Sequence, residues 1–369
     1  LARRLRTAPL DAVPPRSAFP SLSVLVPLKG ADDATEAHLS SLVASILPCE
    51  VEYLFAVESS NDPAFAVCER VRLAHPELRV RIVLSGPAKG RMGKQHNLAA
   101  AAKAARYGII ACVDGDVRVA PGTLAVGMSH LARPDAGAVY FLSVYHGPGP
   151  AGGTLVALYA NYSFCANFGA LALTTRQPAI IGALWLLRRE TLDQLGGFDQ
   201  FTTTASDDAA IGQAIAALGL RCMLVPYTVT IPYERLDLRG GLRHLAKWIA
   251  MLRAEGLPAY ALIAVTWHPL LWSVVALLVG LLAGGAGTLP LSLALAVVAA
   301  LARVGGAALL NARSYGLPPW RLAPWLIPYE LLAVPLLFGA GLFRRTIVWR
   351  GRRYRVGRHG AIQGVSELG

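Results

Sequence analysis

Two long apolar segments near the carboxyl end constrain the fold of this chain more than any other feature. Tyr260–Leu282 and Leu289–Leu310 each approach the ~20 residues that a helix needs to cross a bilayer, so we expect both to be membrane spans. A third segment, Pro324–Phe343, contains three prolines and a glutamate, and we expect it to be re-entrant or bent. The chain is 54% hydrophobic and only 16% charged, which disfavours a wholly soluble protein.

Positive charge is concentrated at the carboxyl end of the chain. The formal net charge is +12, and the segment Arg344–Arg358 holds seven arginines and no acidic residue. Beside apolar helices, such a segment suits an anionic membrane surface better than nucleic acid, so we expect that surface as a partner and no nucleic acid. Because basic connections stay in the cytosol, we expect an integral protein of the inner or cell membrane with its basic parts cytoplasmic. The scattered cysteines, without CxxC or metal-ligand spacing, fit that reducing side.

The first 250 residues show a different pattern, in which short β-rich runs alternate with amphipathic stretches. This alternation is typical of an α/β fold with a parallel sheet. Open α/β sheets bind ligands beyond the carboxyl ends of their strands, so the residues after each run are candidates for a functional site. The runs predicted as strands are Leu22–Pro27, Val51–Val57, Arg79–Leu84 and Ile109–Val113.

The strongest candidate is Asp114-Gly115-Asp116, directly after an apolar strand. Two carboxylates in alternate positions at a strand end suit a divalent hard cation, which can bridge the two phosphates of a nucleotide. The pattern alone is weak because acidic turns are common, but its position after a buried strand strengthens it. We therefore expect Asp114 and Asp116 to hold Mg²⁺ or Mn²⁺.

A second acidic pair, Asp207-Asp208, precedes the helical pattern of residues 210–218. Ser206 or Asp207 is expected to be the N-cap of that helix, and one interpretation is that both carboxylates only cap it. The alternative is that one carboxylate accepts a proton from an attacking hydroxyl while the other orders the site. The residues alone leave both interpretations open.

Two further strand ends carry polar residues that could contact a nucleotide. Glu58 and Asp62 follow the second strand, where either could bind a base or ribose, although Asn-Asp-Pro is also an ordinary turn. Lys94 and Asn97 open a helix after a glycine-containing loop, where they could meet phosphate. A solvated loop is the alternative there.

Two segments are expected at the membrane surface. His244, Lys247 and Trp248 lie just before the first span, and because Trp and Lys anchor interfaces routinely, this run needs no catalytic explanation. Gly152–Leu173 is apolar but carries asparagines and tyrosines, so we expect an interfacial helix, with a core helix of the soluble domain as the alternative. The absence of GxSxG and HExxH motifs gives hydrolases and metalloproteases no support.

Taken in order, these motifs resemble those of membrane glycosyltransferases of the GT-A type, and specifically the ceramide glucosyltransferase family. The bacterial enzymes that glycosylate hopanoids share much of the pattern. The resemblance covers nearly the whole chain. The matching stretches are SVLVPLKGAD (23–32), NDPAFAVCERV (61–71), KQHNLAAAAKAARYGIIACVDGDVRVAPGTL (94–124), RRETLDQLGGFD (188–199), SDDAAIGQAIAALG (206–219) and WRGRRYRVGRHG (349–360).

The resemblance implies a role for each acidic motif. Asp62 matches the family's first acidic position, which is associated with nucleotide binding, and Asp114 matches the second. Asp208 matches the third, the proposed catalytic base. Asp116 matches the second carboxylate of the metal-binding DxD, which members of the family do not all keep.

The family's closing motif is only partly present. Trp248 is retained, whereas His244 and Lys247 replace its two polar positions. Together with Asp207, these three residues are expected in the acceptor or diphosphate region. Lysine has a compact ammonium group, whereas arginine has a planar guanidinium with paired N–H donors. The contacts to diphosphate are therefore expected to differ from those of the family.

The function that the resemblance implies is inverting transfer of a sugar from a UDP-sugar to the hydroxyl of a membrane lipid, with ceramide as the acceptor. Three alternatives remain: a hopanoid-lipid glycosyltransferase using UDP-GlcNAc, a processive polysaccharide synthase, and a basic membrane adaptor without enzymatic activity. The adaptor would leave the ordered acidic strand ends unexplained.

The expected organisation has four parts. A basic segment, 1–20, precedes the chain's GT-A catalytic domain, and an anchor lost upstream of it remains open. The cytoplasmic GT-A domain covers 21–255, with the interfacial helix near 152–173. Transmembrane or re-entrant helices cover 256–343, and an arginine-rich cytosolic tail covers 344–369.

Overall fold

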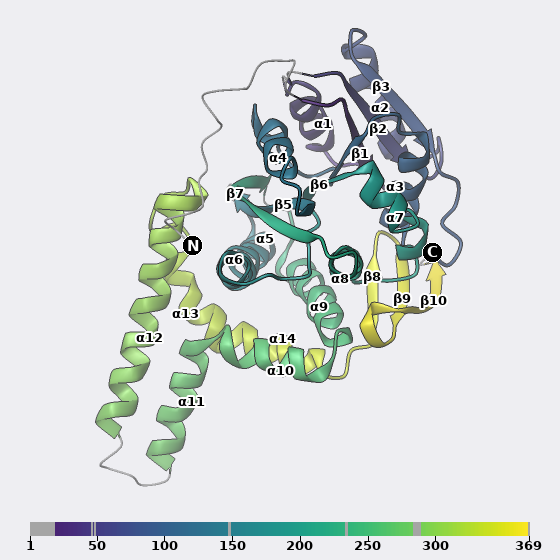
Figure 1. Ribbon diagram of the computed structural model, residues 1–369. Helices are drawn as coiled ribbons and strands as arrows, with labels where there is room; N and C mark the ends of the chain where they lie inside the picture. Colours follow the sequence, from purple (N-terminus) through teal and green to yellow (C-terminus); the bar gives the residue numbers. More distant parts are fainter. Residues whose placement is uncertain are drawn as a thin grey trace. The chain divides into compact units, whose positions relative to one another are not determined.

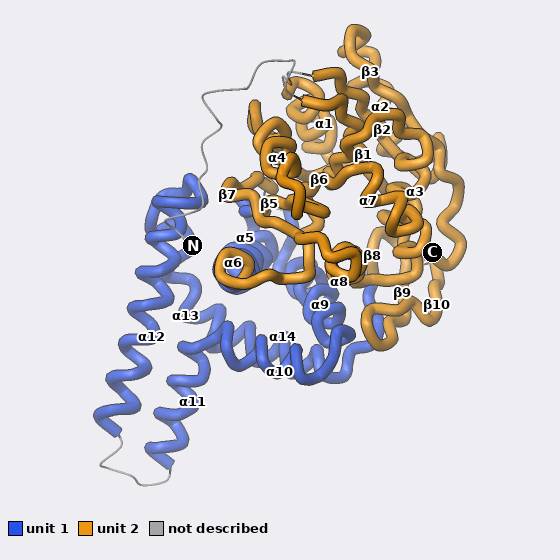
Figure 2. Tube along the Cα trace, in the orientation of Figure 1, with its two compact units in different colours: residues 1–7, 144–170, 233–347 blue, residues 8–143, 171–232, 348–369 orange. Residues whose placement is uncertain are grey.

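The computed structural model describes residues 19–45, 47, 49–146, 149–232, 235–282 and 289–367. Apart from its last two residues, the basic segment predicted for 1–20 lies outside them. The described chain divides into two compact units (Figure 2). The helical unit contains Val144–Ala170 and Tyr233–Ile347, and the sheet unit runs up to Ser143, from Leu171 to Pro232 and from Val348 onward.

A mixed seven-stranded sheet forms the centre of the sheet unit (Figure 1). Its strand order is β3-β2-β1-β4-β6-β5-β7. The first four strands are parallel to their neighbours among themselves, whereas β6 is antiparallel to β4 and β5. The strands are β1 Leu22–Pro27, β2 Val51–Val57, β3 Arg79–Leu84, β4 Ile109–Val113, β5 Ala136–His146, β6 Leu184–Arg188 and β7 Arg221–Pro232.

The predicted α/β fold is confirmed, and β1 to β4 have the bounds expected from their sequence. Strands β1 and β4 are buried on both faces, which is why they appear in the sequence as continuous apolar runs. Because parallel strands need crossover connections, helices separate them and their carboxyl ends share one edge. The helices of this unit are α1 Thr35–Val43, α2 Pro63–Ala74, α3 Gly93–Ala104, α4 Thr123–Leu131, α7 Arg189–Gln194 and α8 Asp207–Ala217.

The segment expected to be an arginine-rich tail is folded into a small sheet. Its strands are β8 Thr346–Trp349, β9 Arg352–Val356 and β10 Ile362–Glu367, in the order β10-β9-β8. Along β9, Arg352, Tyr354 and Val356 are buried while the intervening arginines are exposed. This alternation is that of a strand with one covered face.

The helical unit contains α5 Ala151–Ala157, α6 Ala166–Thr174, α9 Leu238–Ala254, α10 Leu257–Thr266, α11 Pro269–Leu282, α12 Leu289–Leu310, α13 Leu326–Pro328 and α14 Val334–Gly341. Three π-helical segments interrupt these helices, at Leu158–Cys165, Asn311–Tyr315 and Tyr329–Ala333. Helices α5 and α9 cross where glycines meet, since a Cβ added to Gly241 would lie 2.5 Å from Gly152 Cα. Helices α11 and α12 pack side by side (Figure 1).

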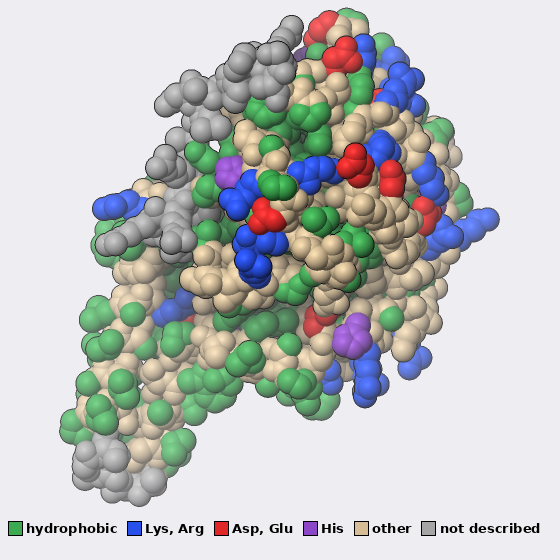
Figure 3. Space-filling view, in the orientation of Figure 1, with side chains coloured by type: hydrophobic (Ala, Val, Ile, Leu, Met, Phe, Trp, Pro, Cys, Tyr) green, Lys and Arg blue, Asp and Glu red, His purple; other side chains and the backbone are tan. Residues whose placement is uncertain are grey.

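Within the described residues, three helical runs are long and apolar enough to cross a membrane, as in a membrane protein: Ala151–Thr174, Leu289–Tyr315 and Ala323–Gly341. Exposed leucines and valines cover α11 and α12, whose described surface is largely hydrophobic in Figure 3. The predicted span Tyr260–Leu282 is broken instead, with a bend of 79° between α10 and α11. Pro269 explains the break because it disfavours helical geometry at His268, which precedes it.

The polar side chains of the run Ala151–Thr174 have partners inside the helical unit. Asn161 accepts a hydrogen bond from the Tyr145 backbone N–H (2.9 Å) and donates one to the Tyr145 carbonyl (3.1 Å). The Tyr162 hydroxyl donates to Asn311 Oδ1 (2.8 Å), and the Tyr315 hydroxyl donates to the Asn161 carbonyl (2.8 Å). These groups therefore pack against protein and are not left to lipid.

A buried ion pair joins two of the candidate spans. Arg303 Nε lies 2.5 Å from Glu330 Oε1, and the Glu330 side chain is fully buried. Arg303 Nη1 also donates to the Tyr162 carbonyl (3.1 Å), and His268 Nδ1 lies 3.8 Å from Glu330 Oε1. The carboxylate in the third apolar segment is thus compensated by the arginine of α12.

We expect Glu330→Gln to lower the free energy of unfolding by about 3–5 kcal/mol, because it leaves the Arg303 charge uncompensated. The double variant Arg303→Met/Glu330→Leu should cost less than the single one, since no lone charge remains. Denaturant unfolding of the detergent-solubilised protein measures both. A double variant as unstable as the single one contradicts this role of the pair.

Candidate functional site

Three aspartates act on one lysine at the carboxyl edge of the sheet, and a fourth acts on one of the three. Lys94 Nζ lies 2.9 Å from Asp114 Oδ1 and donates to the Gly182 carbonyl (3.2 Å). The charges of Asp207 and Asp208 act on the same ammonium group, and the charge of Asp116 acts on Asp114. The cluster joins the end of β4, the first turn of α3 and the first turn of α8.

Burial and mutual repulsion shift the ionisation of this cluster. Burial raises the pKa of Asp114 to about 6. The charge of Lys94 offsets only part of this increase, and the charge of Asp116 adds to the increase. Burial and then the Asp207 charge raise the pKa of Asp208 to about 8. Burial lowers the pKa of Lys94, but the charges of Asp114 and Asp207 outweigh it and hold that pKa above its usual value. The cluster therefore carries negative charge that a single lysine does not balance.

The carboxylate of Asp208 contacts a different segment, which bears on the capping interpretation. Ser206 is the N-cap of α8, as expected, but its side chain makes no capping hydrogen bond. Asp208 is hydrogen-bonded to the backbone of Gly182, and a Cβ added to Gly182 would lie 2.3 Å from Asp208 Oδ1. Its neighbour Asp207 accepts a hydrogen bond from the Gln95 side chain. Both carboxylates are thus positioned by residues outside their own helix.

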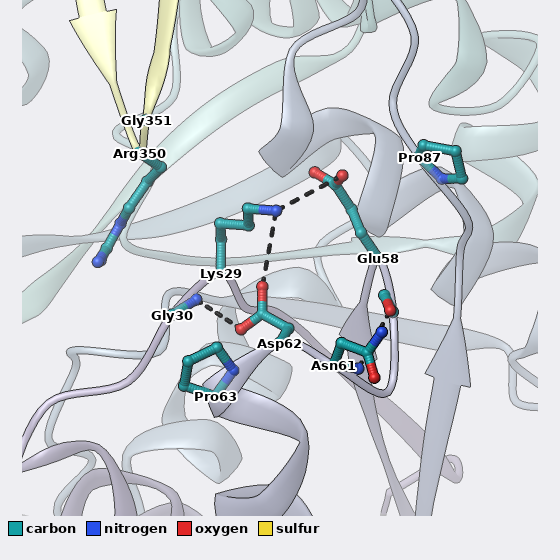
Figure 4. A pocket seen from close by; sticks show the side chains of 10 residues that line it. Lys29, Gly30, Glu58, Asn61, Asp62, Pro63, Pro87, Arg350 and Gly351 are labelled. Atoms are coloured by element: carbon teal, nitrogen blue, oxygen red, sulfur yellow. Dashed lines mark hydrogen bonds and ion pairs between the residues drawn. The ribbon is translucent and has the colours of Figure 1, made fainter. Parts of the chain in front are cut away.

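A cavity of about 760 Å³ lies at the carboxyl ends of β1 and β2 (Figure 4). Lys29 extends between two of its acids, with Nζ 3.6 Å from Glu58 Oε2 and 3.6 Å from Asp62 Oδ2. The cavity is lined by Lys29, Gly30, Glu58, Ser59, Asn61, Asp62, Pro63, Pro87, Arg350 and Gly351. It therefore combines strand ends of the large sheet with the β8–β9 turn.

Glu58 and Arg352 form a buried bidentate pair beside this cavity. Arg352 Nη1 donates to Glu58 Oε1 (2.6 Å) and Nη2 donates to Oε2 (2.7 Å). Burial raises the pKa of Glu58, but the hydrogen bonds and charge of Arg352 outweigh burial and hold it below its ordinary value. A Cβ added to Gly93 would lie 3.2 Å from Glu58 Oε1, so the start of α3 contacts this pair just before Lys94.

Asp62 and Asn97 also hold the strand ends in place. Asp62 is the N-cap of α2, where its side chain accepts from Ala64 N (3.0 Å) and also from Gly30 N (2.7 Å). Asn97 is buried, donates to the carbonyls of Leu28 and Ala56, and accepts from the Ser85 hydroxyl. The Asn97 side chain thus ties β1, β2 and β3 together, which favours a structural role.

The remaining predicted residues lie on α9 of the helical unit. The rings of His244 and Trp248 are 4.5 Å apart and almost perpendicular, and Lys247 Nζ lies 6.0 Å from the Trp248 ring centroid. Tyr159 packs against Trp248 at 5.8 Å between ring centroids. These residues form one aromatic and basic group within their own unit.

Sequence analysis missed several residues of the site. Gln95 stands next to Lys94 in the first turn of α3, and that position was the signal for its contact with Asp207. Lys29 lies two residues after the first predicted strand, yet it was not singled out. Gly182 and the partnership of Arg352 with Glu58 left no local pattern, because both depend on segments far apart in the chain.

The mixed sheet, with acidic groups at the ends of its parallel strands, is that of a GT-A glycosyltransferase. A mannosyltransferase from Pyrobaculum calidifontis, solved with GDP-Man and Mn²⁺, has a similar fold, with a TM-score of 0.51 and 22% identity over 92% of each chain. The model of glycosyl transferase family 21 matches residues 2–362. The chain belongs to glycosyl transferase family 21.

Individual relatives are distant. Ceramide glucosyltransferase 1 of Caenorhabditis elegans is 22% identical over 246 residues, which are 65% of this chain and 51% of that protein. Ceramide glucosyltransferase 3 of the same organism is 21% identical over 254 residues, which are 67% and 53%. O-antigen biosynthesis protein RfbC of Myxococcus xanthus is 27% identical over 238 residues, but these are only 18% of its length. The chain thus spans about half the length of the two ceramide glucosyltransferases.

The Glu58–Arg352 pair predicts how stability depends on pH. Because the folded-state pKa of Glu58 is lowered, the pair stabilises the fold fully above the ordinary value of 4.5, and this stabilisation is lost as pH falls through the folded-state pKa. The difference in unfolding free energy between wild type and Glu58→Gln should therefore be constant near neutral pH and shrink in acid.

Urea unfolding at a series of pH values measures this difference. Glu36→Gln is the matched control, since Glu36 pairs with Arg70 at the exposed surface and should contribute at most about 1 kcal/mol. A wild-type advantage over Glu58→Gln that persists unchanged at acidic pH contradicts the assignment.

Proposed function

We propose that this enzyme transfers a sugar from a UDP-sugar to the hydroxyl of a membrane lipid, with ceramide as the acceptor and with inversion at the anomeric carbon. The observation that carries the proposal is the cluster of half-buried carboxylates around Lys94, at the same edge of the sheet as the 760 Å³ cavity. Ligands of open α/β folds bind at this edge. Membership of family 21 and the ceramide glucosyltransferases among the relatives support the acceptor class.

The cavity at the carboxyl ends of β1 and β2 is the proposed site of the nucleotide, with the nucleoside beside Glu58 and Asp62. Glu58 and Asp62 offer carboxylate oxygens there, and these can accept hydrogen bonds from a ribose or a base. Lys94 is the proposed contact to the diphosphate side, because Gly93 contacts the Glu58 pair and the next residue, Lys94, contacts Asp114. The sugar would then lie near Asp114 and Asp208.

Asp114 and Asp116 fit Mg²⁺ or Mn²⁺ by the chemistry of their oxygen donors. Such ions commonly take one or two carboxylates and complete their shell with water and substrate phosphates. The carboxylates of Asp114, Asp207 and Asp208 outnumber the one ammonium group of Lys94. When bound, the ion would stabilise negative charge on the departing diphosphate.

Asp208 is the proposed base. Its carboxylate is held against Gly182, and burial together with the Asp207 charge raises its pKa, so the ionised form is a stronger base than an exposed aspartate. Asp207, positioned by Gln95, keeps negative charge beside it. The acceptor hydroxyl would lose its proton to Asp208 as its oxygen attacks the anomeric carbon and the diphosphate leaves from the opposite face.

The helical unit is the proposed route for the lipid. Its apolar helices would hold the acceptor near the membrane plane and supply orientation. His244, Lys247 and Trp248 on α9 are the proposed contacts to the acceptor or diphosphate. The proposed orientation is cytoplasmic for the GT-A domain, because arginines flank the connection after α12.

The proposal is tested by incubating membranes that contain the protein with labelled UDP-glucose and ceramide, and separately with labelled UDP-GlcNAc and a hopanoid. We expect label in a ceramide hexoside. Label in the hopanoid instead would assign the alternative lipid, and label in a polymer would assign a synthase. Membranes without the protein are the control, and no labelled product with any acceptor contradicts the proposal.

Asp208→Asn should reduce transfer by ~10² or more while UDP binding stays nearly intact, because a general base contributes about that much. Turnover and UDP affinity are measured on the purified variant. Asp193→Asn, at an exposed position of α7, is the matched control and should behave as wild type. Transfer at the wild-type rate by Asp208→Asn would remove Asp208 from the mechanism.

A further inference from the structure

The cavity is lined by a cationic side chain, Arg350, that forms no ion pair with any described residue. Glu58 is held by Arg352 and by Lys29, and Asp62 is held by Lys29 and the Gly30 N–H. Arg350 lines the same cavity, and the structure gives it no ion-pair partner among the described residues. The acids of the cavity are thus already compensated, and the guanidinium of Arg350 supplies surplus positive charge.

The backbone at Arg350 is unusual for an arginine. Arg350 and Gly351 are the two central residues of the β8–β9 turn, with φ of 48° and 77°. A tight hairpin with positive φ at both positions favours Asn-Gly or Gly-Gly, and a long side chain at the first position costs about 1 kcal/mol. An observed strain of this kind at a cavity points to a use for the side chain.

The hairpin that carries Arg350 is anchored next to the cavity. Arg352, two residues later, makes the bidentate pair with Glu58 at 2.6 and 2.7 Å, and its Nε donates to Glu367 of β10 (2.7 Å). Figure 4 shows Arg350 extending from the hairpin at one side of the labelled residues and Pro87 at the other. The guanidinium is therefore presented by a fixed turn, although its own side chain is exposed.

We propose that Arg350 is a ligand of the diphosphate of the sugar donor. A guanidinium presents paired N–H donors that match two phosphate oxygens, which is the geometry preferred for this anion. The proposal rests on the proposed function, since it deepens the donor site of that reaction. It also gives the arginine-rich segment a task other than binding the membrane surface.

The test measures equilibrium binding of UDP and of uridine to the full-length protein in detergent. Arg350→Asn should weaken UDP binding by about tenfold or more, the range of hydrogen bonds to a charged group, and should leave uridine binding unchanged. The UDP affinity of Arg350→Lys should lie between those of wild type and Arg350→Asn, because lysine keeps the positive charge but lacks the paired N–H donors of the guanidinium. Arg353→Gln, on the exposed face of β9, is the matched control and should bind UDP as wild type does.

The choice of asparagine separates binding from folding. Asn-Gly suits the turn better than Arg-Gly, so Arg350→Asn should protect the β8–β10 amides from hydrogen exchange at least as well as wild type while it loses UDP affinity. Equal UDP affinity in wild type and Arg350→Asn overturns this inference and leaves the proposed function intact. Absence of UDP binding to wild type overturns both. If Arg350→Asn keeps its UDP affinity but binds phosphatidylserine vesicles more weakly than wild type, Arg350 contacts the membrane surface and not the diphosphate.

Discussion

One ammonium group shared among three carboxylates is the constraint on which the edge of the sheet depends. Lys94 reaches Asp114 and the Gly182 carbonyl from the first turn of α3, and Asp207 and Asp208 approach from α8. Charges of one sign crowded into a partly buried place are costly unless a cation or a polar substrate balances them. The proposed transfer uses carboxylates of different basicity, and this use would account for the cost at that edge.

Much of this arrangement could be predicted from the sequence, for identifiable reasons. Strands such as β4 are buried on both faces and so appear as unbroken apolar runs, and acidic residues directly after them were correctly placed at one edge. The start of α8 at Ser206 followed from its capping residue. The long strand β5, Ala136–His146, was not predicted, because an apolar run of this kind does not by itself distinguish strand from helix.

The prediction failed where a role depends on a distant partner. The alternation of buried and exposed residues in β9 can be predicted from its sequence. No neighbouring residue indicates that Arg352 forms a hydrogen bond with Glu58. In the helical unit, the prolines of segment 324–343 indicated that this segment is not a regular straight helix, but the position of its π-helical part depends on packing. Glu330 is buried because Arg303 compensates it, and the π-helical segment Tyr329–Ala333 presents it to that partner.

The separation of Glu58 and Arg352 has a consequence for biosynthesis. They are 294 residues apart, so at ~5–20 residues per second a ribosome takes roughly 15–60 s to make the second after the first. Throughout that time, the apolar helices between them are being synthesised, and Glu58 has no Arg352 with which to form the ion pair. The wall of the cavity is completed only by the last strands of the chain. A prematurely terminated or cleaved product therefore lacks that wall, and a nascent chain gains it only after its hydrophobic segments have left the ribosome.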